Sequence, residues 1–214
     1  MISAAVEPSS CLWTDQPDEL KAIHEPHVLM GVLERTVPPG LREYIDEGFS
    51  TLRCKREVTV ANPAESLDQL FHGLPAGAGA DLFRADIHFL ARLFHKVVGA
   101  PRAHLKLEAF QGNLCERFHT DNVPMRLICC YLGPGTQWLD YADVNRDKLG
   151  PGSGGLPDEQ SGLIRPGAII HQLPRFAVGL MKGNRWPGNS RRGLVHRSPR
   201  AADPCQQRVL LKIE

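Results

Sequence analysis

Apolar positions along the first part of the chain recur with the spacing of short strands and helices. The apolar run His27–Arg35 has the length of a strand, and residues 52–60 end in the β-branched residues typical of a second strand. Between them, a short helix that ends at Gly48 is expected after the turn at residues 38–40. Another short helix is expected over Ala64–Leu74.

The clearest helix is predicted over Leu82–Val98. Its apolar residues recur at alternating spacings of four and three, which is the period of one helix face. These residues are Phe83, Ile87, Leu90, Phe94 and Val97. Asp81 is expected to cap the amino end, and Gly99 to follow the carboxyl end, where a left-handed residue favours glycine. The helix should therefore pack one apolar stripe against the core.

After Pro101 the pattern becomes strand-like. Residues 104–110 alternate between polar and apolar, as in a half-buried strand. Further strands are expected at Met125–Leu132, Ala168–Leu173, Phe176–Met181 and Gln207–Ile213. The segment Asp140–Pro166, rich in Gly, Asp and Pro, predicts a surface lid or insertion. Helices that lead and strands that follow predict a mainly β fold with N-terminal helices (α+β), in which the helices pack on an antiparallel β-architecture.

Length and composition indicate one globular domain. The chain has 214 residues, of which 42% are hydrophobic, enough to bury a sizeable core. We expect residues 1–20 to form a loosely ordered arm and residues 21–214 a single domain. Within it, residues 21–100 are expected to be mostly helical support, and residues 101–214 to form the β core.

The charge balance and the targeting signals indicate which partners and which cellular location to expect. Lys and Arg number 25 and Asp and Glu 24, so no nucleic-acid partner is indicated, and a small-molecule or peptide substrate is expected. The chain carries no visible secretory signal and no apolar run of the roughly 18–20 residues that span a membrane. Its six cysteines lack any CxxC spacing, which favours reduced thiols. A cytoplasmic protein without a membrane partner is therefore predicted, and the oligomeric state is left open.

The polar pair His119 and Asp121 carries the candidate chemistry. Residues two apart on an extended segment point to the same side, and His196 follows Asp121 by 75 residues. If the fold brings the three together, two imidazoles and one carboxylate would surround one side of a metal ion, as in non-haem Fe(II) oxygenases. A loop histidine and a turn aspartate are the alternative reading of the pair. His171 is a rival third ligand that also suits a core position, and Cys115 could join a zinc site.

Arg208 is a candidate residue for binding a cosubstrate. It lies twelve residues after His196, on the last predicted strand. A guanidinium binds a carboxylate through two hydrogen bonds. Together, His119-x-Asp121, His196 and Arg208 resemble the Fe(II)/2-oxoglutarate-dependent dioxygenases. The resemblance implies a double-stranded β-helix (a jelly-roll or cupin-like barrel) over roughly residues 100–214. It also implies Fe(II) held by the first three residues, 2-oxoglutarate anchored by Arg208, and an oxygenase of the hydroxylase type.

A narrower resemblance covers most of the chain. The segments FHTDNVPMRLICCYLGPGTQW, LMKGNRWPGN and GLVHRSP resemble an uncharacterised bacterial family of unknown function. Its members are often encoded near zinc-responsive and metallochaperone genes. That resemblance therefore allows an alternative in which the same residues bind Zn(II) in a barrel that performs no redox chemistry and acts in metal homeostasis.

The strand that follows the pair offers two more candidates for cosubstrate contact. Arg126 alternates with apolar residues on one face, and Tyr131 lies on the other face. Either Arg126 or Tyr131 is expected to contact the cosubstrate, and the pattern does not choose between them. Trp138 and Trp186 are expected in the core or in the wall of a substrate pocket. Arg197 has either a structural role or a contact with an anionic substrate.

Overall fold

The computed structural model describes residues 10–62, 64–112, 114–200, 203 and 205–214. Its strands are β1 (Cys11–Thr14), β2 (Met30–Leu33), β3 (Cys54–Val60), β4 (Ala103–Gln111), β5 (Met125–Leu132), β6 (Gln137–Leu139), β7 (Ile170–Gln172), β8 (Val178–Lys182), β9 (Val195–Arg197) and β10 (Gln207–Ile213).

The helices contain slightly fewer residues in total than the strands. The α-helices are α1 (Pro39–Gly48), α2 (Asp68–Phe71) and α3 (Ala80–Val98). The 3-10 helices are η1 (Pro17–His24), η2 (Tyr141–Asp143), η3 (Arg146–Lys148) and η4 (Gly150–Ser153). Across the part of the chain that the structure describes, no helix combines the length and the apolar character needed to cross a membrane.

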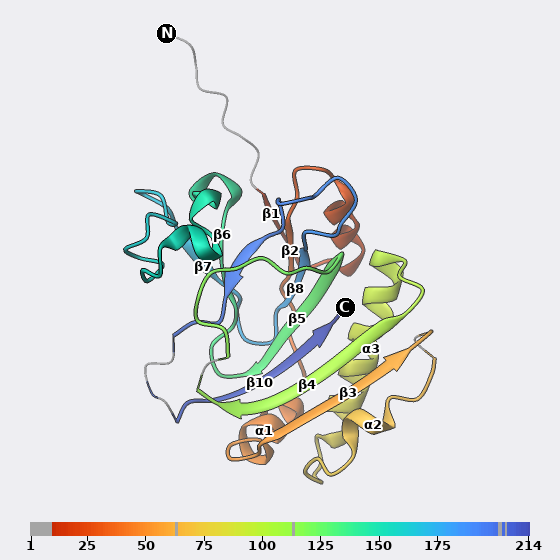
Figure 1. Ribbon diagram of the computed structural model, residues 1–214. Helices are drawn as coiled ribbons and strands as arrows, with labels where there is room; N and C mark the ends of the chain where they lie inside the picture. The colour runs from red at the N-terminus through yellow and green to blue at the C-terminus, as the bar shows by residue number, and fades with distance from the viewer. Residues whose placement is uncertain (1–9, 63, 113, 201–202, 204) are drawn as a thin grey trace.

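The strands form two sheets. Seven strands have the order β1-β2-β8-β5-β10-β4-β3, and the other three have the order β7-β6-β9. Neighbouring strands are antiparallel except β1 and β2, which are parallel. Figure 1 shows the α-helices gathered beside β3 and β4, and the β6–β7 unit at the other end of the molecule. The prediction of a mainly β chain with some helices is confirmed, and the two sheets do not close into one continuous barrel.

Helix α3 has the buried stripe that its sequence predicts. All five apolar residues of the stripe are buried in the cluster that joins the helices to the large sheet. Gly99 has φ 68°, the left-handed conformation that ends a helix at low cost for glycine. The amino end differs from the prediction, because Gly79 is the capping residue and Asp81 lies within the first turn.

The large sheet separates two cores because side chains alternate along each strand. On β10, Val209, Leu211 and Ile213 are buried with the helices. Leu210 points the opposite way, into a second cluster between the two sheets. Arg208 and Lys212 share the face of Leu210 and therefore also point toward the small sheet.

The amino-terminal part of the chain differs from the expected arm and helical support. Within residues 10–20, β1 pairs with β2, and Leu20 is fully buried. Gly31 makes this possible, because a Cβ there would lie 2.9 Å from Leu20 Cδ2. Together β1, β2 and β3 add three strands to the large sheet, so the first hundred residues supply more than helical support. Residues 1–9 lie outside the described residues.

A buried polar cluster joins α3 to the large sheet. Asp86 of α3 forms an ion pair with Arg35, and both side chains are nearly buried. Tyr131 of β5 donates a hydrogen bond to Asp86 Oδ2 at 2.5 Å. Arg35 Nε donates to the carbonyl of Phe176 at 2.8 Å, just before β8. The carboxylate therefore joins three elements that are far apart in the sequence.

Replacing Asp86 should destabilise the fold strongly, because Arg35 would remain buried without its counter-ion. We expect Asp86→Ala to lower the free energy of unfolding by about 3 kcal/mol or more. Tyr131→Phe removes one hydrogen bond and should cost about 1 kcal/mol. Urea unfolding of the two variants beside the unmodified chain measures both effects. Equal losses in the two variants would contradict this role for the ion pair.

Candidate metal centre

Two histidines face each other across a short backbone pairing. His119 lies in the connection between β4 and β5, and His196 lies in β9. The backbone N–H of each donates to the carbonyl of the other at 3.0 Å. Because directly opposed residues of an antiparallel pair point to the same side, the imidazole rings approach with centroids 4.6 Å apart.

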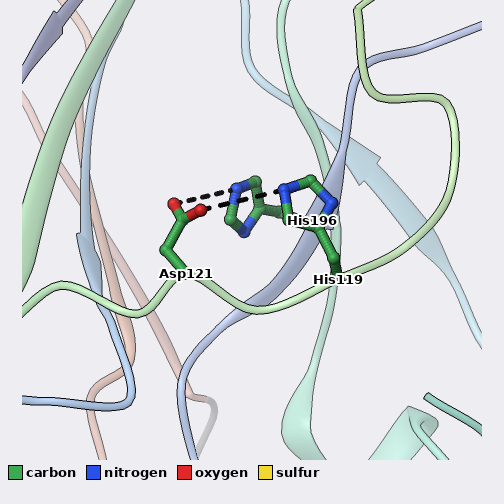
Figure 2. Close-up of side chains that lie close together, drawn as sticks. All are labelled: His119, Asp121 and His196. Carbon is green, nitrogen blue, oxygen red and sulfur yellow. Dashed lines mark ion pairs between the residues drawn. The ribbon is translucent and has the colours of Figure 1, made fainter. Parts of the chain in front are cut away.

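Asp121 completes the group from the same connection as His119. Figure 2 shows its carboxylate pointing toward both rings. Asp121 Oδ2 lies 3.2 Å from His196 Nε2, and Oδ1 lies 3.8 Å from His119 Nε2. One ligand atom from each of the three residues lies within 4.8 Å of the others, so the group could hold one metal ion. The fold therefore brings together the predicted residues His119, Asp121 and His196, which we call the metal group.

The backbone orients both imidazoles. His119 Nδ1 lies 2.8 Å from the carbonyl of Arg117, and His196 Nδ1 lies 3.1 Å from the carbonyl of Leu194. A carbonyl can only accept, so each Nδ1 carries a proton and each Nε2 faces the group. Metal-binding histidines in proteins are commonly fixed by such a second hydrogen bond.

The protonation states also suit metal binding. Burial alone would raise the pKa of Asp121, but the hydrogen bond and charge of His196, together with Arg126, hold it below its usual range. Burial and the neighbouring His196 lower the pKa of His119. An ionised carboxylate beside a neutral imidazole is the state in which both donate lone pairs to a cation.

Arg126 supports the carboxylate of Asp121. Its Nη1 forms an ion pair with Asp121, and its Nε donates to Glu214 Oε2 at 3.1 Å. Arg126 is thus held between two carboxylates at the start of β5. Its position fits the fixing of Asp121 better than direct binding of a cosubstrate.

Tyr131 is not brought to the metal group. It lies on the helix side of the sheet, fully buried between Phe83 and Phe176, and its hydroxyl is bound to Asp86. Of the two candidates for cosubstrate contact, Tyr131 therefore lies on the face of β5 that points away from the His119, Asp121 and His196 group. His171 is also elsewhere, because it pairs with Asp140 on the small sheet.

Arg208 is a buried cation on the same side of the sheet as the metal group. Its side chain is fully buried. Nε donates to the carbonyl of Pro134 at 3.1 Å, and Nη1 donates to Ser198 Oγ at 2.9 Å. Nη2 has no hydrogen-bond partner among the described residues, and no carboxylate within those residues pairs with this guanidinium.

Ser198 contacts Arg208 and lies close to His196 in the sequence. It follows His196 by two residues, so on an extended segment the two side chains share a face about 7 Å apart. A small cavity of about 60 Å³ is lined by His119, His196 and Ser198, and also by Arg126 and Cys115. The cavity therefore reaches Ser198, whose hydroxyl accepts a hydrogen bond from Arg208.

Asp158 is a site residue that the sequence reasoning missed. It lies in the expected insertion and is 2% exposed. Its Oδ2 accepts from the backbone N–H of Phe118 at 2.7 Å and from Arg197 Nη1 at 3.3 Å. Phe118 precedes His119 and Arg197 follows His196, so one carboxylate joins the segments of both histidines. In the sequence, Arg197 beside His196 indicated a charged contact near the site. No local pattern identified Asp158 as its partner.

Asp158→Asn should loosen this connection. The amide keeps the shape but leaves the nearly buried Arg197 with less negative charge, so we expect a loss of about 2 kcal/mol in the free energy of unfolding. Glu159→Gln is the matched control, because Glu159 also pairs with Arg197 but is more exposed. Its loss should be well under 1 kcal/mol. Chemical denaturation compares the two, and a larger loss in the control would refute the role of Asp158.

Comparison with known proteins identifies the family. The model of the family described as "Protein of unknown function (DUF1826)" matches residues 14–214, so the chain belongs to that family. This confirms the resemblance to an uncharacterised family, and no curated protein matches the sequence.

Several solved structures are similar at low identity. A Pseudomonas putida prolyl-4-hydroxylase is 9% identical, with a TM-score of 0.43 over 92% of this chain and 96% of the other. The dioxygenase for auxin oxidation 1 of Arabidopsis thaliana, in complex with 2-oxoglutarate, is 9% identical, with a TM-score of 0.46 over 95% and 90%. Iron-bound HygX of Streptomyces hygroscopicus is 11% identical, with a TM-score of 0.46 over 86% and 81%. Likeness at this level assigns no activity to the chain.

Proposed function

We propose that this protein is an Fe(II)/2-oxoglutarate-dependent oxygenase of the hydroxylase type that acts on a small molecule or peptide. In this proposal His119, Asp121 and His196 hold Fe(II), and Arg208 binds the distal carboxylate of 2-oxoglutarate. The observation that carries it is the buried guanidinium of Arg208, whose Nη2 lacks a partner among the described residues. A buried charge without a counter-ion is costly, and a bound carboxylate would supply one.

The strand order supports a double-stranded β-helix. The strands β8-β5-β10-β4 are consecutive in the large sheet. The small sheet has the order β7-β6-β9, and the His119–His196 bridge adds the β4–β5 connection next to β9. Two facing sets of four segments, between which the chain passes back and forth, fit a jelly-roll of eight strands. The metal group then lies on the small set, facing the large one.

The donor set fits the proposed metal. Two imidazole nitrogens and one carboxylate on one side of an ion leave positions open for a cosubstrate and O2. When bound, Fe(II) with 2-oxoglutarate would supply the oxidising chemistry, in which decarboxylation to succinate and CO2 provides two electrons for O2 reduction.

The protein's own residues would orient and shield the reactants. The Nδ1 hydrogen bonds of His119 and His196 fix the ring planes, and Arg126 holds the carboxylate of Asp121. Ile128 and Leu210 line the cavity with apolar surface, which limits water beside the metal. Because Arg126 is already engaged by two carboxylates, Arg208 is the better anchor for the cosubstrate.

Anaerobic titration with Fe(II) and 2-oxoglutarate tests the proposal. We expect the weak visible metal-to-ligand charge-transfer absorption of a keto acid chelated to Fe(II), and we expect its loss in His119→Ala. The matched control is His171→Ala, which removes a histidine of the small sheet outside the metal group. Tight stoichiometric Zn(II) binding without this absorption would instead support the non-redox metal-binding alternative.

Arg208→Gln separates cosubstrate binding from metal binding. The amide retains hydrogen-bonding groups but loses the charge and the fork geometry, so the 2-oxoglutarate dissociation constant should rise by about 30-fold or more. Fe(II) affinity, measured without 2-oxoglutarate, should change little. Arg200→Gln is the control, since that guanidinium is half exposed and pairs with Glu159. An unchanged dissociation constant in Arg208→Gln would remove Arg208 from the site.

A further inference from the structure

A second buried cation lies on the opposite face of the large sheet. Lys182 ends β8, on the same face as Val178 and Leu180, which pack with the helices. Its side chain is almost completely buried, with 2% exposure. Lysine is among the residues least often buried without a partner. The metal centre lies on the other face of the sheet and therefore does not account for the burial of Lys182.

The surroundings of Lys182 do not neutralise its charge. Nζ donates to the backbone carbonyl of Glu25 at 2.7 Å, just beyond η1. Within the described residues, no carboxylate forms an ion pair with it. Burial lowers the pKa of Lys182, the Glu25 carboxylate acts in the opposite direction, and Arg192 lowers it further. An ammonium in this position would gain from a bound anion.

A cavity of about 340 Å³ opens beside this lysine, a volume suited to a small metabolite. Its described lining includes no Asp or Glu and carries further basic side chains. The lining includes His24, His27, Lys182, Trp186, Asn189 and Arg192. Trp186 forms one wall, with its ring edge-to-face with His24 at 5.2 Å and Lys182 Nζ 5.7 Å from its centroid.

We propose that this cavity binds a small organic anion. Lys182 and Arg192 would bind its phosphate or carboxylate group, and Trp186 would contact its planar apolar part. The competing explanation is that Lys182 only caps the carbonyl that follows η1, in which case no anion binds. The proposal does not depend on the oxygenase function.

Such a ligand would contact the segment that supports the metal centre. The loop that follows Lys182 places the backbone N–H of Asn184 2.9 Å from the carbonyl of Asp121. The Asn184 side chain donates to Thr120 Oγ1 at 2.8 Å. The cavity and the metal group therefore contact the same loop, although they lie on opposite faces of the large sheet.

Isothermal titration calorimetry of the full chain with phenyl phosphate, inorganic phosphate and phenol tests the site. Phenyl phosphate should bind saturably and more tightly than either fragment, because it can use both the cations and Trp186. Lys182→Met should weaken phenyl phosphate and phosphate by about tenfold or more. Trp186→Leu should remove most of the advantage of phenyl phosphate over phosphate.

Two further variants keep the test decisive. Lys21→Met is the matched control, because Lys21 is exposed on η1 and outside the cavity lining. It should leave all three affinities unchanged. If Lys182→Met fails to fold, Arg192→Ala replaces an exposed side chain and should still weaken phenyl phosphate severalfold. The absence of saturable phenyl phosphate binding, or equal binding in Lys182→Met or in a folded Arg192→Ala, would overturn the proposal.

Discussion

The backbone pairing of His119 with His196 is the constraint on which the candidate site depends. Two reciprocal hydrogen bonds place residues 77 positions apart in direct opposition, so their imidazoles must share one side of the small sheet. Asp121 then reaches the rings from the same strand segment as His119. Asp158 strengthens this arrangement from outside, because its carboxylate binds the neighbours of both histidines.

Buried charge organises the rest of the molecule. The large sheet carries the ion pair of Arg35 and Asp86 on its helix side, where Tyr131 completes the cluster. That pair is satisfied within the protein. Arg208 and Lys182 are different, because neither buried cation has a carboxylate partner among the described residues. A buried cation without a counter-ion would gain from an anionic ligand, which is why we propose one such ligand on each face of the sheet.

The pattern of apolar residues in the sequence predicted several elements closely. The stripe of α3 and the bounds of β5 and β10 agree with the pattern. The expected helix over Ala64–Leu74 is reduced to α2, because few local signals define such a short element. The sequence separated Arg126 and Tyr131 onto opposite faces of β5, but did not say which face holds the metal group.

The sequence by itself indicated which side chains are of a metal-binding type and which side chains share a face, because residue type and strand alternation are local properties. It was sufficient to propose His119, Asp121 and His196 together, and to associate Arg208 with them. Only the tertiary structure decided that Tyr131 belongs to the helix-side core, that Asp158 joins the segments of His119 and His196, and that Lys182 is buried without a carboxylate partner among the described residues. These are consequences of strand order and long-range packing, which depend on contacts between residues that no local pattern connects.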